Sequence, residues 1–205
     1  MTDDSSGPGD APPDGPTFDD GRRHDPPGEP HPDWPVVESA VEYETGWFTG
    51  GYDLVEQPDG SHKRYYWAEL PAAAVVVAVA DGNVLFVEQY RPTIRETQLE
   101  LPAGIVEAGE SFTAAGRREL REETGFAAGA TSRLQRVWCT TGLLRHRRGY
   151  VFAEGLSPVG TDLDDNEFVT PRAVPADEAL AVAREEPTND ATLEGLLVAA
   201  DEGLI

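Results

Sequence analysis

The sequence predicts an α+β fold in which a mixed β-sheet is packed between helices. Short segments of alternating or continuous apolar character, separated by turn residues, run from Trp34 to about residue 105 and resume after Gly125. One strongly charged helical segment lies between these two groups of strands, and two helical segments close the chain. This order is not a regular βαβ series, so it favours a mixed sheet covered by helices.

The first 33 residues are predicted to be a disordered tail. They are rich in Pro, Gly and Asp and contain almost no large apolar side chains. Such a segment cannot bury enough surface to offset the entropy lost on ordering. The rest of the chain, residues 34–205, is long enough for a single domain of ordinary size and is predicted to form one.

The domain begins with predicted strands. Residues 34–70 alternate apolar and polar side chains around the turn signal Pro58-Asp59-Gly60, which indicates an N-terminal antiparallel β region. The segments "AAAVVVAVA" (72–80) and "VLFVEQY" (84–90) flank a second turn signal, Asp81-Gly82-Asn83. Because the first of these two segments is almost continuously apolar, we expect it to be a central strand that is covered on both faces.

The second half of the domain is predicted to alternate between strands and helices. The segment "TQLELPAGIVEAGE" (97–110) is a strand that runs into a Gly-containing loop, and the helix "GESFTAAGRRELREETGF" (109–126) follows it. The remaining expected elements are strands near 133–140, 147–156 and 167–174 and helices near 177–186 and 189–202, with Pro187 as the breaker between the two helices.

Composition excludes several classes of protein. Cys139 is the only cysteine, which excludes an intramolecular disulfide and any zinc site built on several thiolates. No apolar run is long enough to span a bilayer, and the acidic N-terminus is the opposite of a secretory signal. We therefore expect a soluble, cytoplasmic protein without a membrane partner.

The formal net charge of −22 is the most unusual feature of the composition. The first 33 residues contain nine acidic residues and two arginines and so carry only −7 of it, and Lys63 is the only lysine beside fifteen arginines. An acidic protein of an ordinary cytoplasm is one interpretation. We favour a halophilic protein, because molar salt screens the self-repulsion of such a surface. Either way, the charge opposes non-specific binding of nucleic acid.

The helix at 109–126 carries the candidate chemistry. Glu119, Glu122 and Glu123 lie on one side of it, although like charges four apart destabilise an isolated helix by about 0.2–0.5 kcal/mol per pair. Their hard oxygen ligands suit Mg²⁺ or Mn²⁺. A solvated helix with an Arg118–Glu122 ion pair is the alternative interpretation. It explains neither the unrelieved Glu119–Glu123 pair nor the regular spacing from Gly104.

The full pattern over residues 104–126 is G-x5-E-x7-R-E-L-x-E-E-x-G-F. It resembles the defining box of the Nudix hydrolases at every specified position. This resemblance implies a Nudix-type α/β/α sandwich and a metal-dependent hydrolase that cleaves the diphosphate of a nucleoside diphosphate linked to another moiety. It also implies a metal site for Mg²⁺ or Mn²⁺, formed by Glu119, Glu122, Glu123 and the backbone carbonyl of Ala103. In that catalytic set Arg118 orients the carboxylates, and Glu110 helps to hold metal or water.

The segment before the box resembles the ADP-ribose pyrophosphatase branch of that family. The resemblance lies in Gln89-Tyr90-Arg91 and in the run from Glu100 to Gly104. It implies that ADP-ribose or a related nucleotide sugar is cleaved to a nucleoside monophosphate and a sugar phosphate, that Arg91 contacts the substrate phosphates, and that Glu100 lies near substrate or metal. It further implies a homodimer formed through the N-terminal β region. The alternative interpretations, which we favour less, are a surface arginine that ends a strand for Arg91 and a strand-face carboxylate for Glu100.

Two questions stay open at the level of sequence. The basic run Arg145-His146-Arg147-Arg148 receives the phosphates of a more highly charged substrate or pairs with the protein's own acids. The first option suggests a dinucleoside polyphosphate or nucleoside triphosphate pyrophosphohydrolase, and a non-catalytic nucleotide-sensing module is a further alternative. The general base is Glu122 or one of three acids in a later loop, Asp164, Asp165 and Glu167.

Overall fold

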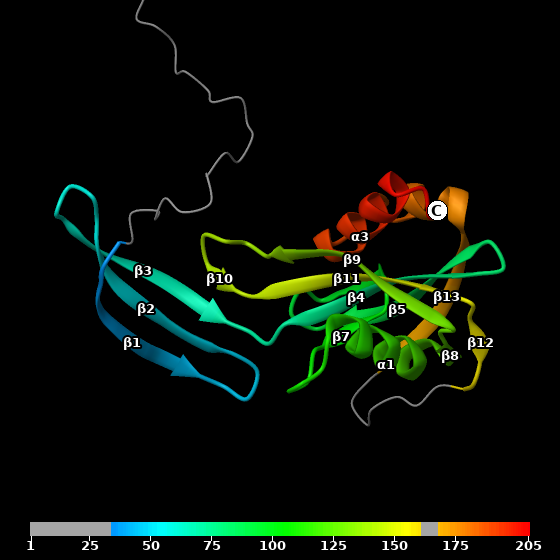
Figure 1. Ribbon diagram of the computed structural model, residues 1–205, viewed down its shortest axis with the longest axis horizontal. Helices are drawn as coiled ribbons and strands as arrows, with labels where there is room; N and C mark the ends of the chain where they lie inside the picture. The colour runs from blue at the N-terminus through cyan, green and yellow to red at the C-terminus, as the bar shows by residue number, and fades with distance from the viewer. Residues whose placement is uncertain (1–33, 161–167) are drawn as a thin grey trace, which may run out of the picture.

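The computed structural model describes residues 34–160 and 168–205, which form two β-sheets, a short two-stranded ribbon and three helices (Figure 1). The predicted tail and the loop acids Asp164, Asp165 and Glu167 lie outside the described residues. Figure 1 shows an elongated molecule in which the N-terminal sheet projects from one end of a larger body. In the described part of the chain, no helix combines the length and the apolar character that crossing a bilayer requires.

The N-terminal sheet is an antiparallel meander of β1 (Val36–Glu44), β2 (Thr49–Glu56) and β3 (His62–Glu69). The turn predicted at Pro58-Asp59-Gly60 joins β2 to β3, and Gly60 takes the left-handed conformation there, with φ of 81°. The body adds a fourth strand, β10 (Leu144–Arg145), which pairs parallel to the end of β3. This short pairing anchors the N-terminal sheet to the body.

The body is built on a seven-stranded mixed sheet. Its path runs in the order β13 (Val169–Pro175), β5 (Asn83–Arg91), β4 (Ala73–Ala80), β11 (Arg147–Glu154) and β9 (Ala130–Trp138). In addition, β6 (Glu96–Glu100) pairs with β5, and β7 (Ala103–Ile105) pairs with β4. The β4–β11 pair is parallel and the others are antiparallel, so the sheet is mixed as predicted.

Strand β4 is central and buried, as its continuous apolar sequence predicted. Because successive side chains point to opposite faces, Val75 and Val77 join a core cluster with Leu196 of α3, whereas Val76 and Ala78 join a second cluster with Leu120 of α1. Helix α1 (Phe112–Thr124) thus covers one face of the sheet. Helices α2 (Ala176–Val182) and α3 (Asp190–Asp201) cover the other, which confirms the α/β/α sandwich (Figure 1).

Several element ends differ from the prediction. The strand expected at 133–140 begins at Ala130 and ends at Trp138. The helix expected at 177–186 ends at Val182. Pro187 has no N–H to donate to the Ala183 carbonyl, which accepts the Thr188 hydroxyl at 2.6 Å instead. A short ribbon of β8 (Phe126–Ala127) and β12 (Ser157–Pro158), which the sequence pattern did not predict, closes the end of α1.

Candidate active site

Both ends of helix α1 are capped, and these caps fix the position of its glutamates relative to strand β7. The Ser111 hydroxyl caps the first turn by accepting from the Ala114 N–H at 3.1 Å. Gly125 ends the helix in the left-handed conformation, with φ of 73°, and donates its N–H to the Arg121 carbonyl. Gly125 of the sequence pattern is therefore the C-cap of α1.

Gly104 lies in strand β7, where the sequence predicted a loop, and it is in direct contact with Glu119. A Cβ built on Gly104 would lie 2.0 Å from the Glu119 carboxyl carbon and 2.0 Å from its Oε1. Glu119 itself is only 6% exposed, so it has little room to move away. The strand β7 backbone and the α1 carboxylate therefore touch directly, which explains the fixed spacing between Gly104 and Glu119.

Arg118 gathers the carboxylates of the loop and the helix. Its Nη1 donates to Glu119 Oε1 at 2.8 Å and to Glu122 Oε2 at 3.0 Å. Its Nη2 donates to the Ile105 carbonyl at 2.8 Å and to Glu110 Oε2 at 3.2 Å. The surrounding carboxylates, Glu110 first, raise the pKa of Arg118 above its ordinary value, and Arg118 lowers the pKa of Glu110. The guanidinium is thus permanently charged and holds three glutamates around one point.

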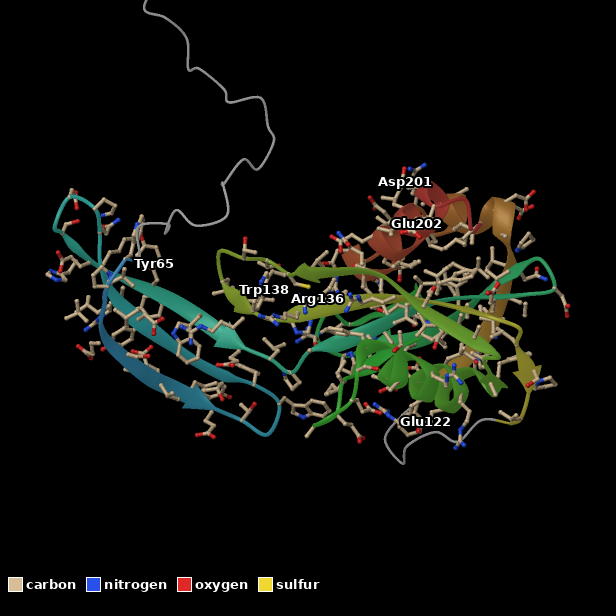
Figure 2. The ribbon with its side chains drawn as sticks, in the orientation of Figure 1. Tyr65, Glu122, Arg136, Trp138, Asp201 and Glu202 are labelled. Carbon is tan, nitrogen blue, oxygen red and sulfur yellow. The ribbon has the colours of Figure 1, made fainter. Side chains whose placement is uncertain are left out.

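Glu123 faces the same loop from one turn further along α1. It is 4% exposed, and its Oε2 accepts the backbone N–H of Ala103 at 3.0 Å. The structure therefore brings the predicted metal-binding set together: Glu119 and Glu123 lie against β7 at Gly104 and Ala103, and Glu122 is held beside them by Arg118 (Figure 2 labels Glu122).

The donor set fits a hard divalent cation. Glu110, Glu119 and Glu122 accept hydrogen bonds from Arg118, and Glu123 lies on the next turn of the helix. Two of these four carboxylates, Glu119 and Glu123, are buried, and carboxylate oxygens are the ligands that a hard divalent cation prefers. Within residues 34–160 and 168–205, no three His, Cys, Asp or Glu side chains are already arranged as a complete ion site. The chemistry of the residues thus fits a metal whose remaining ligands come from a substrate or from water.

Arg91 and Glu100, predicted from the segment before the box, also lie together. Arg91 Nε donates to Glu100 Oε2 at 2.9 Å, and its Nη2 donates to the same oxygen. Glu100 is 8% exposed and also accepts the side-chain N–H of Asn189, at 3.2 Å from its Oε1. Sequence reasoning missed Asn189, whose only signal is its position as an N-cap residue before an apolar helix.

The basic run is divided among separate partners. Arg145 pairs with Asp53 and lies over the Trp67 ring, 4.0 Å from its centre. Arg148 pairs with Asp190 at 3.2 Å and Glu194 at 3.5 Å. Of the three arginines in the run, Arg147 alone forms no ion pair with a carboxylate among the described residues, and it stacks on Trp138 at 4.2 Å. Pairing with the protein's own acids therefore explains Arg145 and Arg148.

The stretch before this run lines a cavity at the base of the N-terminal sheet. The cavity has a volume of about 360 Å³. Its walls are the 141–145 segment on one side and aromatic residues of β3 on the other, namely Tyr65, Tyr66 and Trp67. Sequence reasoning selected the basic run at 145–148 but did not connect it or the residues before it with β3, because nothing in the local pattern indicates the β3–β10 pairing.

Comparison with known proteins agrees with this arrangement. The NUDIX domain model matches residues 69–196. The chain is 32% identical to the ADP-ribose pyrophosphatase of Bacillus subtilis over 67% of this chain and 76% of that protein. It is 31% identical to the ADP-ribose pyrophosphatase of Mycobacterium tuberculosis over 80% of this chain and 82% of that protein.

A solved structure shares the fold. The crystal structure of an ADP compounds hydrolase superimposes with a TM-score of 0.77 at 19% identity, over 87% of this chain and all of that chain. The N-terminal sheet lies largely outside the residues that the domain model matches, whereas Gly104, Arg118 and the three α1 glutamates lie within them. The chain therefore belongs to the NUDIX family and is a Nudix hydrolase similar to the ADP-ribose pyrophosphatases.

Proposed function

We propose that this protein hydrolyses the diphosphate of a nucleoside diphosphate linked to another moiety, with ADP-ribose or a related nucleotide sugar as the leading substrate. The observation that carries the proposal is the convergence of Glu110, Glu119 and Glu122 on Arg118, with Glu123 held against Ala103. The relatives named above support the choice of substrate. The products are a nucleoside monophosphate and a sugar phosphate.

Glu119, Glu122, Glu123 and the Ala103 carbonyl would hold Mg²⁺, or Mn²⁺ in its place. When bound, such an ion polarises a phosphoryl oxygen and lowers the pKa of bound water. Arg118 keeps the Glu119 and Glu122 carboxylates aimed at one point, and the Ala103 N–H fixes Glu123. Arg91 binds a phosphate through the part of its guanidinium that Glu100 does not use.

The reaction is the attack of water on one phosphorus of the diphosphate. A carboxylate accepts the proton from the water, the new P–O bond forms, and the bond to the bridging oxygen breaks so that the second phosphate leaves. Glu122 is a candidate for this base because its side chain is 27% exposed beside the buried pair. The loop acids Asp164, Asp165 and Glu167 are the other candidates.

The test is hydrolysis across a panel of ADP-ribose, other nucleotide sugars, dinucleoside polyphosphates and nucleoside triphosphates, with added Mg²⁺ or Mn²⁺ at low and molar salt. Preferred turnover of ADP-ribose or a nucleotide sugar supports the proposal. Preferred turnover of a polyphosphate would instead favour the alternative that the basic run suggested. Tight nucleotide binding without turnover of any compound would show that the protein is a nucleotide-sensing module rather than an enzyme.

We also propose that the protein is a homodimer formed through its N-terminal sheet. Large apolar side chains of β1 face solvent: Val36, Val41 and Tyr43 are 56%, 58% and 59% exposed. Exposed apolar side chains that lie close together mark interaction surfaces, and a second copy of the chain would cover them. Sedimentation should then give twice the 22.2 kDa mass of one chain. Val41→Lys should yield monomers, whereas Leu197→Lys, at an exposed apolar position on α3, should not.

The working environment is part of the same proposal. We infer a cytoplasm of high ionic strength from the net charge of −22 and the single lysine. Activity measured against salt concentration tests this inference, because a halophilic enzyme retains or gains activity in molar salt whereas an enzyme from an ordinary cytoplasm loses it.

A further inference from the structure

The first turn of α3 is tied to the end of strand β6. Asn189 is the N-cap of α3, and its Oδ1 accepts the Thr192 N–H at 2.8 Å. The Nδ2 of the same amide donates to Glu100 Oε1 at 3.2 Å. Beside it, the buried Thr192 hydroxyl accepts the Leu101 N–H at 3.1 Å. The helix therefore holds both the Glu100 side chain and the backbone that follows it.

Capping alone does not explain why the residue at 189 is asparagine. Asp, Ser and Asn cap helices about equally well, because each supplies an oxygen that accepts a backbone N–H. Aspartate has no donor, and serine has its donor and acceptor on one oxygen, whereas asparagine carries them on two atoms and can bind Thr192 and Glu100 at the same time. The orientation of the amide follows from its partners, since only the oxygen accepts from Thr192 and only the nitrogen donates to a carboxylate. The hydrogen bond from Asn189 to Glu100 is thus an interaction that helix capping does not require.

The Glu100 carboxylate, which Asn189 holds, in turn fixes the orientation of the Arg91 side chain. Both Nε and Nη2 of Arg91 donate to Glu100 Oε2, so the planar guanidinium is held along one edge. Its Nη1 has no hydrogen bond within the part of the chain that the structure describes, and the side chain is 44% exposed. The carboxylate therefore determines the direction in which the remaining N–H donors point.

The same segment continues to the metal-binding set. Three residues after Glu100, the Ala103 N–H donates to Glu123. Residues 100–103 are thus held by α3 at one end and by α1 at the other. An element that is absent from the sequence pattern of the box, the start of α3, is in this way joined to both groups of predicted site residues.

We propose that Asn189 is a positioning residue for substrate binding. Its amide orients the Glu100 carboxylate, and Glu100 holds Arg91 so that Nη1 faces the substrate diphosphate. The proposal rests on the role given to Arg91 in the proposed function. It assigns Asn189 an effect on the binding of substrate rather than on the chemical step.

The first test is the variant Asn189→Ser, which retains a cap and loses the donor to Glu100. We expect the KM of the best substrate to rise about 3- to 10-fold, as for the loss of one hydrogen bond, with kcat within about twofold of the parent. Asn189→Asp, an equally good cap that places a second carboxylate against Glu100, should raise KM further. Asn189→Ser should keep a melting temperature close to that of the parent, whereas the repulsion between two carboxylates should lower it in Asn189→Asp.

The matched control is Thr192→Val, in the same helical turn. This change leaves the buried Leu101 N–H without its partner but keeps the Asn189–Glu100 hydrogen bond, so we expect a lower melting temperature with a smaller rise in KM than in Asn189→Ser. A merely structural role for Asn189 predicts the opposite pattern, in which a capped Asn189→Ser protein has the KM of the parent. If Asn189→Ser has the KM of the parent and does not shift the NMR signal of the Arg91 Nε–H, the proposal is wrong.

A second readout does not depend on turnover. The Nε–H of Arg91 gives an NMR signal that Arg91→Lys removes, and Asn189→Ser should shift it whereas Thr192→Val should not. If Arg91→Lys leaves KM unchanged, Arg91 does not bind substrate, and the positioning role proposed for Asn189 is wrong. The proposed hydrolase function is not affected by that result. If nothing in the panel is hydrolysed, the proposed function fails, and the Arg91 signal alone decides whether Asn189 orients Arg91.

Discussion

The carboxyl group of Glu119 lies against Gly104 so closely that a Cβ on residue 104 would be 2.0 Å from it. This contact joins strand β7 to the helix that carries the candidate metal ligands. Residue 104 must therefore be glycine for Glu119 to keep this position. Any side chain at 104 would displace either the β7 backbone or the buried Glu119 carboxylate.

Gly104→Ala should therefore disable the site. The added methyl moves Glu119, and a displacement of about 1 Å in a catalytic group can lower the rate by about 100-fold. We expect kcat/KM to fall by at least that order, measured on the best substrate of the panel. Gly46→Ala is the matched control, because a Cβ at 46 has no neighbour within 4 Å. Parent-like activity of Gly104→Ala would show that Glu119 is not needed where the structure places it.

Arg118→Lys should weaken metal binding and turnover together. A lysine has one ammonium group and cannot bridge Glu110, Glu119, Glu122 and the Ile105 carbonyl at once. Loss of such an orienting partner lowers metal affinity or activity by about 10- to 100-fold. Mg²⁺ titrations of the rate measure both effects. Arg117→Lys, whose guanidinium contacts Thr131 instead, should stay within about twofold, since it touches none of these groups.

Glu123→Gln should leave a folded protein that binds the metal poorly. The amide oxygen of glutamine still accepts the Ala103 N–H, but the side chain no longer carries the charge that a divalent cation needs. We expect the rate at low Mg²⁺ to fall by about 100-fold or more with little change in melting temperature. The same change at exposed Glu107 should have no effect. An unaltered Mg²⁺ dependence in Glu123→Gln would refute the metal assignment.

Acid should loosen the loop that Arg118 holds. Arg118, and then the Glu107 N–H, lower the pKa of Glu110 from its ordinary value of 4.5. A carboxylate with a lowered pKa stabilises the fold at pH values above 4.5, and this contribution disappears as the pH falls through the folded-state pKa. Melting temperatures below pH 5 should therefore fall less steeply in Glu110→Gln than in the parent. Identical slopes would show that the Glu110–Arg118 pair does not contribute.

Salt should stabilise the protein. A net charge of −22 repels itself at low ionic strength, and molar salt shortens the screening length to about 3 Å. The melting temperature should thus rise between 0.1 M and 2 M KCl. A flat or falling curve would favour the interpretation of the chain as an acidic protein of an ordinary cytoplasm.

Much of the fold and the catalytic core could be predicted from local patterns. The continuous apolar run of β4, the turn at Gly60 and the helix between Ser111 and Gly125 are each specified by residues that are neighbours in the chain. The α1 glutamates could be predicted for the same reason, because helical periodicity places residues three and four apart on one side. The end of α2 could not, since it depends on the hydroxyl of Thr188 beyond it.

The sequence by itself indicated the reaction class, because the spacing of Gly104, Arg118 and the glutamates of α1 resembles the Nudix box. Only the tertiary structure decided that Glu119 lies on Gly104, that Asn189 reaches Glu100 across 89 residues, and that Arg145 pairs with Asp53 rather than remaining open to a ligand. The reason is physical. Local periodicity decides which side of an element a residue occupies, whereas the partner it meets there depends on strand pairing and helix packing between distant parts of the chain.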